Sequence, residues 1–195
     1  MSSRGRRPGG PDTRGQILEA ARDSFAAKGF RATTIRGVAA DAGVDAALVH
    51  HYFGTKDDLF VASLEIPVDP RQALAAAFAD GLDGAGERLL DTMLSVWDQP
   101  DARRPLVALV RSGLGDPSST LLQDGLVRVV FKSLGEQLPE ADREVRAGLV
   151  ASQVLGLIVG RYVLGTEPLA SLRREQLVAL VGPTLQRYLS GPLDD

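Results

Sequence analysis

Apolar residues recur at helical spacing along most of this chain. Near the start, Ile17, Leu18, Ala21 and Phe25 form one stripe, and the positions between them are mostly polar or small. No stretch keeps the strict alternation of apolar and polar residues that a half-buried β-strand requires. The pattern therefore predicts an all-α fold.

Residues 35–53 have the pattern of two helices joined by a tight turn. Gly43 can adopt the left-handed conformation that ends the first helix, and the small Ala39 allows the two helices to cross closely. Asp45 is well suited to cap the second helix. We expect an opening helix from Thr13, capped with Gln16 at capping-box spacing, to complete a three-helix head.

The second helix of this pair has two distinct faces. At about 100° per residue, Val49, Tyr52 and Phe53 fall on one side, and Ala47 and His51 point away from them. Small residues and imidazoles on the outward face suit a helix that enters the major groove of DNA. The stretch is therefore predicted to be a DNA-binding helix-turn-helix.

Polar residues at the neighbouring helix starts suggest phosphate contacts. Either Thr33 or Thr34 is expected to cap the first helix of the pair, and the other hydroxyl to reach a phosphate, unless both serve the fold alone. Thr55 and Asp58 form a second capping box. Lys56 lies in that first turn, where the helix dipole disfavours a cation, so a phosphate partner would explain it.

Residues 12–65 resemble the N-terminal domain of the TetR family of bacterial transcriptional repressors. The matching residues are Ala26-Ala27-Lys28-Gly29-Phe30, Thr33-Thr34-Ile35, Val38-Ala39-x-x-Ala42-Gly43-Val44, Tyr52-Phe53 and Lys56-x-x-Leu59. The resemblance implies phosphate contacts near Thr33, Thr34, Tyr52 and Lys56, and base-edge contacts from Ala46, Ala47, His50 and His51.

The chain departs from the family pattern at three positions on or beside the second helix. The family most often has Ser where this chain has Asp45, often Gly at Ala47, and often Tyr at His50. Asp45 is expected either to serve only as a cap or to accept a hydrogen bond from a cytosine amine. The family's operator sequences cannot therefore be transferred to this chain.

The charge is unevenly distributed. Residues 1–66 carry nine Lys/Arg and eight Asp/Glu, a net of +1, while residues 67–195 carry thirteen and seventeen, a net of −4, which together give −3. Basic residues gather at Arg4, Arg6, Arg7 and Arg14. Either the head neutralises phosphates, with Arg14 in contact with DNA, or the excess is ordinary scatter. Residues 1–11 are expected to form a flexible basic arm, which follows the DNA or only aids solubility.

Several function classes are disfavoured. The chain has no cysteine, and its two histidines, His50 and His51, are adjacent on a helix and point about 100° apart, which suits neither one metal nor a catalytic triad. We expect no metal, no cofactor and no enzyme activity; an all-helical enzyme using only carboxylates is the remaining catalytic alternative. No signal peptide or membrane span is predicted, so a cytoplasmic, nucleoid-associated bacterial protein is expected.

The remaining two-thirds of the chain is predicted to be a larger helical bundle. The domains are expected to be a head over residues 12–66 and a body over residues 67–195. Pro67 and Pro70 form the link, and Pro183 is expected to kink the last helix or to start its second half. The predicted body helices are residues 71–80, 87–98, 103–114, 118–138, 140–164 and 172–189.

The helix over residues 140–164 is apolar on nearly every side after residue 149. Such a helix must be covered all round, either by the rest of its own chain or by a second copy. We expect it to pair, together with the last helix, with the same helices of a second protomer, and the TetR resemblance implies the same. The predicted dimer interface is Leu149, Gly156, Gly160, Val163, Leu177, Leu180 and Leu185.

A ligand pocket is expected among the middle helices, although each candidate residue could equally be plain core. The candidates are Phe78, Met93, Trp97, Leu109, Arg111, Phe131 and Gln153. The predicted function is a homodimeric repressor that binds a near-palindromic, double-stranded operator and leaves it when a small apolar effector binds. The alternative is a helical protein-interaction module that does not bind DNA.

Overall fold

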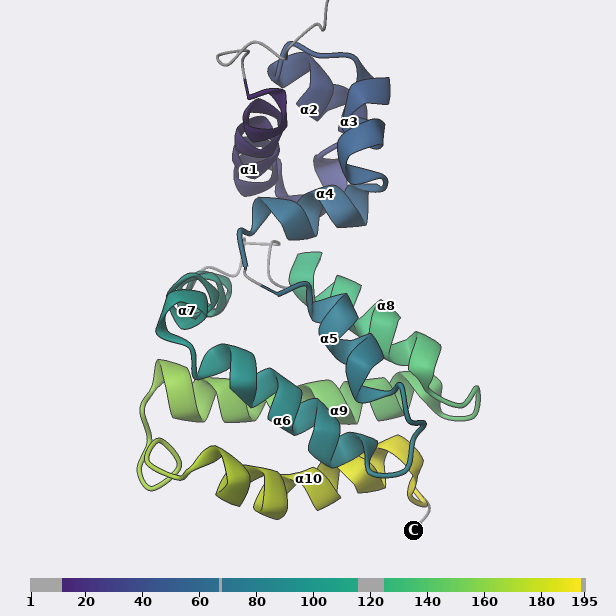
Figure 1. Ribbon diagram of the computed structural model, residues 1–195, viewed down its shortest axis with the longest axis vertical. Helices are drawn as coiled ribbons and strands as arrows, with labels where there is room; N and C mark the ends of the chain where they lie inside the picture. The colour runs from purple at the N-terminus through teal and green to yellow at the C-terminus, as the bar shows by residue number, and fades with distance from the viewer. Residues whose placement is uncertain (1–11, 67, 116–124, 194–195) are drawn as a thin grey trace, which may run out of the picture. The chain divides into compact units, whose positions relative to one another are not determined.

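The computed structural model describes residues 12–66, 68–115 and 125–193, and these residues are helical with no strand. The chain divides into two compact units, Met1–Ser63 and Leu64–Asp195, which are the head and the body (Figure 1). The predicted boundary was after Ile66. The predicted basic arm, residues 1–11, and the start of the predicted helix at 118 lie outside the described residues.

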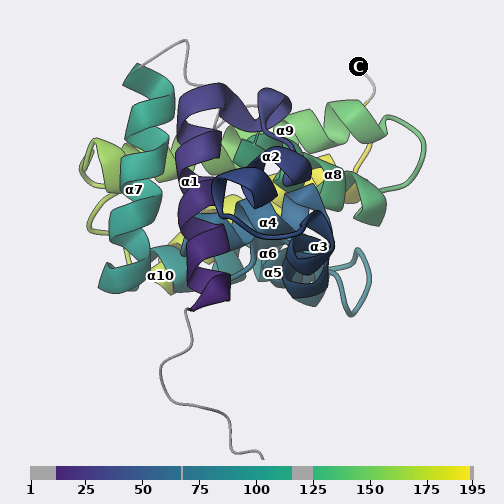
Figure 2. The same cartoon turned by 90° about the horizontal axis from the view of Figure 1, so that it is seen from above.

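The head consists of α1 (Thr13–Ala32), α2 (Ile35–Asp41), α3 (Ala46–Phe53) and α4 (Lys56–Ser63), seen from above in Figure 2. The cap of α1 is Asp12, whose carboxylate accepts a hydrogen bond from the Gly15 N–H at 3.0 Å, so the predicted cap at Thr13 is one residue late. Gly29 has φ of 73° and interrupts α1 where the sequence predicts its end.

Three phenylalanines form the centre of the head. The rings of Phe25 and Phe30 stack at 5.7 Å between centroids, and Phe60 meets both edge-on at 5.1 and 5.2 Å. Ile17 from α1 and Val38 from α2 are fully buried beside them. This small core draws on α1, α2 and α4 and fixes the platform on which α3 is held.

The body is built from helices, and residues 125–127 are a π-helical stretch directly before α8. The bounds of the helices are α5 (Pro70–Ala77), α6 (Ala85–Trp97), α7 (Pro100–Gly115), α8 (Arg128–Gln137), α9 (Arg143–Ile158), η2 (Val159–Val163) and α10 (Arg174–Ser190). Each of the six described α-helices overlaps one of the predicted body helices. The last helix continues through Pro183 as one helix, so the expected restart there is wrong.

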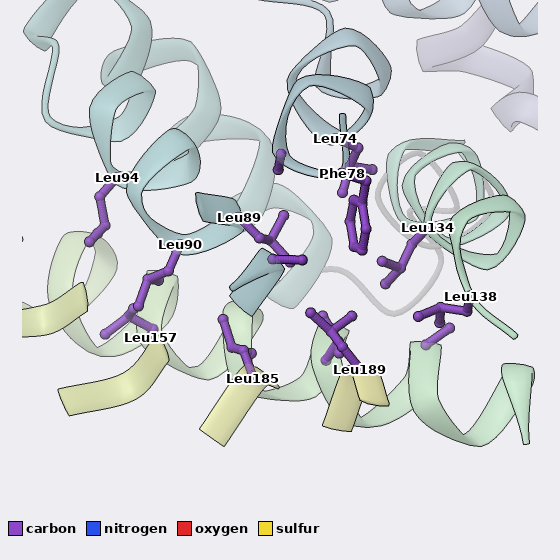
Figure 3. Packing of buried hydrophobic residues seen from close by; sticks show 14 of the residues in the cluster. Leu74, Phe78, Leu89, Leu90, Leu94, Leu134, Leu138, Leu157, Leu185 and Leu189 are labelled. Carbon is purple, nitrogen blue, oxygen red and sulfur yellow. The ribbon is translucent and has the colours of Figure 1, made fainter. Parts of the chain in front are cut away.

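Leucines fill the core of the body. Figure 3 shows Leu90, Leu94 and Leu157 towards one end of the cluster and Leu134 and Leu138 towards the other. Leu185 and Leu177 of α10 are 0% and 1% exposed within a single protomer. They therefore cannot belong to a dimer interface, and that part of the prediction is wrong, because the α6 and α9 of the same chain cover them.

The close crossing of α6 and α10 depends on Gly86 of α6 and Gly182 of α10. A Cβ added at Gly86 would lie 2.5 Å from the Gln186 nitrogen and 2.6 Å from the Gly182 carbonyl oxygen, distances that backbone atoms cannot tolerate. The Gly86 N–H donates to Gln186 Oε1 at 2.9 Å, and Gln186 Nε2 donates to the Leu82 carbonyl at 2.9 Å. The side-chain amide thus joins the two helices where the glycines let them touch.

Within the described residues, no helix is both long enough and apolar enough to cross a bilayer.

We expect Gly86→Ala to lower the free energy of unfolding by about 1–3 kcal/mol, because the new methyl group forces α6 and α10 apart. Urea denaturation at one fixed protein concentration measures the change. Gly148→Ala on α9 is the control: an added Cβ there meets nothing within 4 Å, and it should be neutral or stabilise by up to about 1 kcal/mol. Equal stability of the Gly86→Ala variant and the wild type would contradict the proposed packing.

Candidate nucleic-acid interface and ligand cavity

The turn between α2 and α3 has the geometry that the sequence predicts. Gly43 has φ of 68°, and the Val44 N–H donates to the Ala39 carbonyl at 2.9 Å, which closes the end of α2. The Asp45 carboxylate caps α3 by accepting from the Ala47 N–H at 2.7 Å. Buried Val49 holds α3 against the head.

The outward face of α3 carries small and aromatic polar residues. Ala47, His50, His51 and Tyr52 are exposed, and Ala46 is half-buried. His50 Nδ1 lies 2.8 Å from the Gly54 carbonyl oxygen. Because a carbonyl only accepts, this nitrogen must carry the proton, and Nε2 of a neutral His50 is then an acceptor. The predicted base-contacting residues therefore do share one accessible face.

The two threonines before α2 have different roles. Thr34 caps the helix by accepting from the Gly37 N–H at 3.0 Å and is exposed. Thr33 is 1% exposed, and its hydroxyl donates to the carbonyls of Ser24 and Gly29 at 3.0 and 2.9 Å. The predicted phosphate contact from Thr33 is therefore corrected: its hydroxyl serves the interior of the head.

Two basic side chains of the head, Lys56 and Arg14, were predicted to contact DNA. Lys56 Nζ donates to the Arg31 carbonyl at 3.2 Å and lies 4.5 Å from the Phe30 ring centroid. Its place in the first turn of α4 thus has an intramolecular explanation, beside the confirmed capping box of Thr55 and Asp58. Arg14 is exposed, with its guanidinium 5.3 Å from the ring centroid of Phe53 on α3.

The body contains an apolar cavity of about 210 Å³. Three of the predicted ligand-binding residues, Met93, Trp97 and Phe131, line it. Residues that sequence reasoning missed complete the walls, among them Ile66, Thr92, Leu106, Val110, Val130, Ala151, Val154 and Ile158. They are ordinary core residues by pattern, so no signal in the sequence distinguishes them from packed leucines and valines elsewhere.

Four predicted pocket residues do not line this cavity. Phe78 is buried in the leucine cluster. Leu109 packs against the cluster that contains Trp97 but does not line the cavity. Arg111 is exposed, and its Nη2 donates to the Val163 carbonyl at 3.1 Å. Gln153 is half-buried away from the cavity wall. The predicted polar handles are thus wrong, since helix packing turns both side chains away.

Family comparisons cover both units. Residues 17–63 match the model described as bacterial regulatory proteins, tetR family. Residues 83–189, more than half of the chain, match the tetracyclin repressor-like C-terminal domain. The chain belongs to the TetR family. It is therefore a helix-turn-helix transcriptional regulator and not an enzyme.

Individual TetR-family proteins support the assignment. A TetR-family regulator of known structure from Streptomyces coelicolor A3 is 40% identical, with a TM-score of 0.58, over 95% of this chain and 98% of that one. The transcriptional regulator BetI of Burkholderia thailandensis is 27% identical over 78% of this chain and 80% of its own length. The regulator HbdR of an Aromatoleum species is 30% identical over 60% of this chain, a match that spans 52% of HbdR.

Trp97, which lines the cavity, packs against a polar network that the sequence did not predict. Trp97 stacks on Tyr162 at 5.3 Å, and the Tyr162 hydroxyl donates to Asp98 Oδ1 at 2.8 Å. Arg161 Nη2 lies 3.4 Å from the same oxygen, and its Nη1 donates to three carbonyls, those of Leu169, Ala170 and Leu172. The network joins the end of α6 to η2 and to the loop before α10.

TetR-family regulators act as dimers, and several predicted interface residues are on the surface of this protomer. Leu180 is 66% exposed, and Gly156 is exposed with open space where a Cβ would lie. Leu149 and Val163 are half-buried. Gly160 instead approaches its own chain, because an added Cβ would lie 2.9 Å from Leu169 Cδ2.

The phenol of Tyr162 should make stability depend on alkaline pH. Burial, and secondly the hydrogen bond to Asp98, raise the pKa of Tyr162 above its ordinary value of 10.0. Above pH 10 the unfolded chain ionises this phenol and the folded chain does not, so the free energy of unfolding should fall as pH rises. Urea denaturation between pH 9 and pH 11 measures the fall.

Tyr162→Phe should show a smaller decline over the same range, and Tyr188→Phe on α10 should follow the wild type. An identical decline in all three proteins would show that Tyr162 is not the group responsible.

Proposed function

We propose that this TetR-family protein is a homodimeric repressor that binds a near-palindromic operator through α3 and is released by a small apolar effector. The observation that carries the proposal is the face of α3. Ala47, His50 and His51 are exposed together, while Val49 and Phe53 on the opposite side are buried in the head. Such a helix can enter a major groove without disturbing its own support.

Residues near α3 are placed to contact the phosphates of the DNA. Thr34 and Tyr52 are exposed at the start of α2 and near the end of α3, where helix termini and hydroxyls contact phosphates. Lys56 can exchange its contact with the Arg31 carbonyl for a phosphate, and Arg14 lies beside Phe53. Asp45 is occupied as the cap of α3, which supports the capping role over contact with cytosine.

The dimer is proposed to use the exposed apolar positions of α9 and α10. Val145 and Leu180 are 58% and 66% exposed, and Leu149 and Gly156 continue the same side of α9 at helical spacing. A two-fold axis through these helices would hold two α3 helices at a fixed separation, which selects operators with matching half-sites. Operator binding would place the protein on chromosomal DNA in the bacterial cytoplasm.

Release requires a ligand that binds one arrangement of the dimer better than another. The cavity beside Trp97 offers the site, because its wall continues through Tyr162 and Arg161 to the segments that lead into α10. A gel-shift assay on DNA flanking the protein's own gene tests the proposal. A shifted band that is insensitive to salt, or that persists with an unrelated duplex, would contradict specific operator binding.

Two head variants should separate phosphate contact from base contact. Lys56→Ala should weaken binding to every sequence and reduce the log–log salt slope by about 0.9, because one phosphate contact is lost. His51→Ala should instead relax base preference, at a cost of about 1–3 kcal/mol for the preferred site only. Fluorescence anisotropy at several salt concentrations measures both.

Lys28→Ala is the matched control, since the Lys28 ammonium pairs with Asp41 at 3.5 Å. If it changed the salt slope as much as Lys56→Ala, the assignment of Lys56 would fail.

Leu180→Glu should raise the dimer dissociation constant by about tenfold or more, because it brings a charge into an apolar interface. Sedimentation velocity over a concentration series measures the shift. Leu114→Glu, at a position 53% exposed on α7, is the matched control and should leave the dimer intact. Equal weakening by both substitutions, or by neither, would place the interface elsewhere.

A further inference from the structure

The cavity in the body is unusual in the chemistry of its wall. Among its described lining residues no side chain carries a charge, and only two carry a polar group: the hydroxyl of Thr92 and the indole N–H of Trp97. The two groups lie on α6, five positions apart in the sequence. The lining residues from α8 and α9, including Val130, Ala151 and Val154, are all apolar.

The charged pair at the Trp97 end of α6 is engaged with its own neighbours and not with the cavity. Asp98 follows Trp97 directly, but its Oδ1 accepts from Tyr162 and faces Arg161. The Nη1 of Arg161 donates to carbonyls of the loop before α10. A charged ligand in the cavity would therefore lose its hydration without gaining a counter-charge, and an unpaired buried ion is strongly disfavoured.

The volume limits the size of the ligand. A dry apolar cavity of about 150 Å³ accommodates benzene, so about 210 Å³ suits a molecule of roughly eight non-hydrogen atoms. We propose that the cavity selects uncharged, mainly hydrocarbon molecules of about this size, with at most one hydroxyl-like group directed to Thr92 and Trp97, and rejects cations and anions of the same frame. This inference rests on the proposed function only for its consequence on DNA; the binding itself is independent of it.

Four probes that share one carbon frame test the selection: ethylbenzene, 2-phenylethanol, 2-phenylethylammonium and phenylacetate. Trp97 is the sole tryptophan and lines the cavity, so its fluorescence reports occupancy, and isothermal titration calorimetry provides an independent affinity. We expect the two neutral probes to bind at least about a hundredfold more tightly than either ion. Equal binding of an ion, or no binding of either neutral probe, would overturn the proposal.

Three variants locate the site. Ala151→Leu fills the cavity and should abolish binding of both neutral probes, whereas Ala75→Leu, at an exposed position of α5, should not. Thr92→Val should weaken 2-phenylethanol by about fivefold and leave ethylbenzene unchanged. Binding that survives Ala151→Leu would place the ligand elsewhere and overturn the assignment.

A gel shift with the same probes separates this inference from the proposed function. Neutral probes that bind the cavity but leave the operator complex intact would contradict effector release and leave ligand selection standing. Release of DNA by the charged probes alone would contradict the ligand selection and leave the regulator function standing.

Discussion

The orientation of α3 depends on one small apolar contact. Val38 and Ala39 on α2 and Val49 on α3 are almost completely buried, and the left-handed turn at Gly43 brings them together. This contact determines which residues of α3 face the DNA in the proposed complex. Because Val49 is buried, Ala47 and His51 point outward. A larger residue at Ala39 would open the crossing and rotate the outward face away from its support.

The body follows a similar principle on a larger scale. Gly86 and Gly182 permit α6 and α10 to touch, and the buried leucines of α9 and α10 then close around α6. Close packing at that crossing contrasts with the open, apolar space beside Trp97 on the same α6. One helix thus combines a close contact at its start with an apolar cavity wall at its end. Under the proposed function, a ligand in that cavity would act on the ends of α9 and α10.

The sequence was most informative where the signals are local. Gly43, Asp45 and the Thr55–Asp58 pair fix turns and caps through neighbours within a few residues, and the structure confirms each. The faces of body helices depend on distant partners. Leu177 and Leu180 look alike in the sequence, but α6 covers the first and leaves the second exposed. Thr33 and Arg111 were misjudged for the same reason, since carbonyls on other segments decide where they point.

Under the proposed function, two copies of α3, held apart by paired bodies, bind one duplex together. The most direct measurement uses an operator selected from random duplexes and a second version with five base pairs inserted between its half-sites. We expect two protomers per original duplex and a large loss of affinity after insertion, because half a helical turn moves one half-site to the opposite face of the DNA. Equal affinity for both duplexes, or one protomer per duplex, would contradict the proposed function.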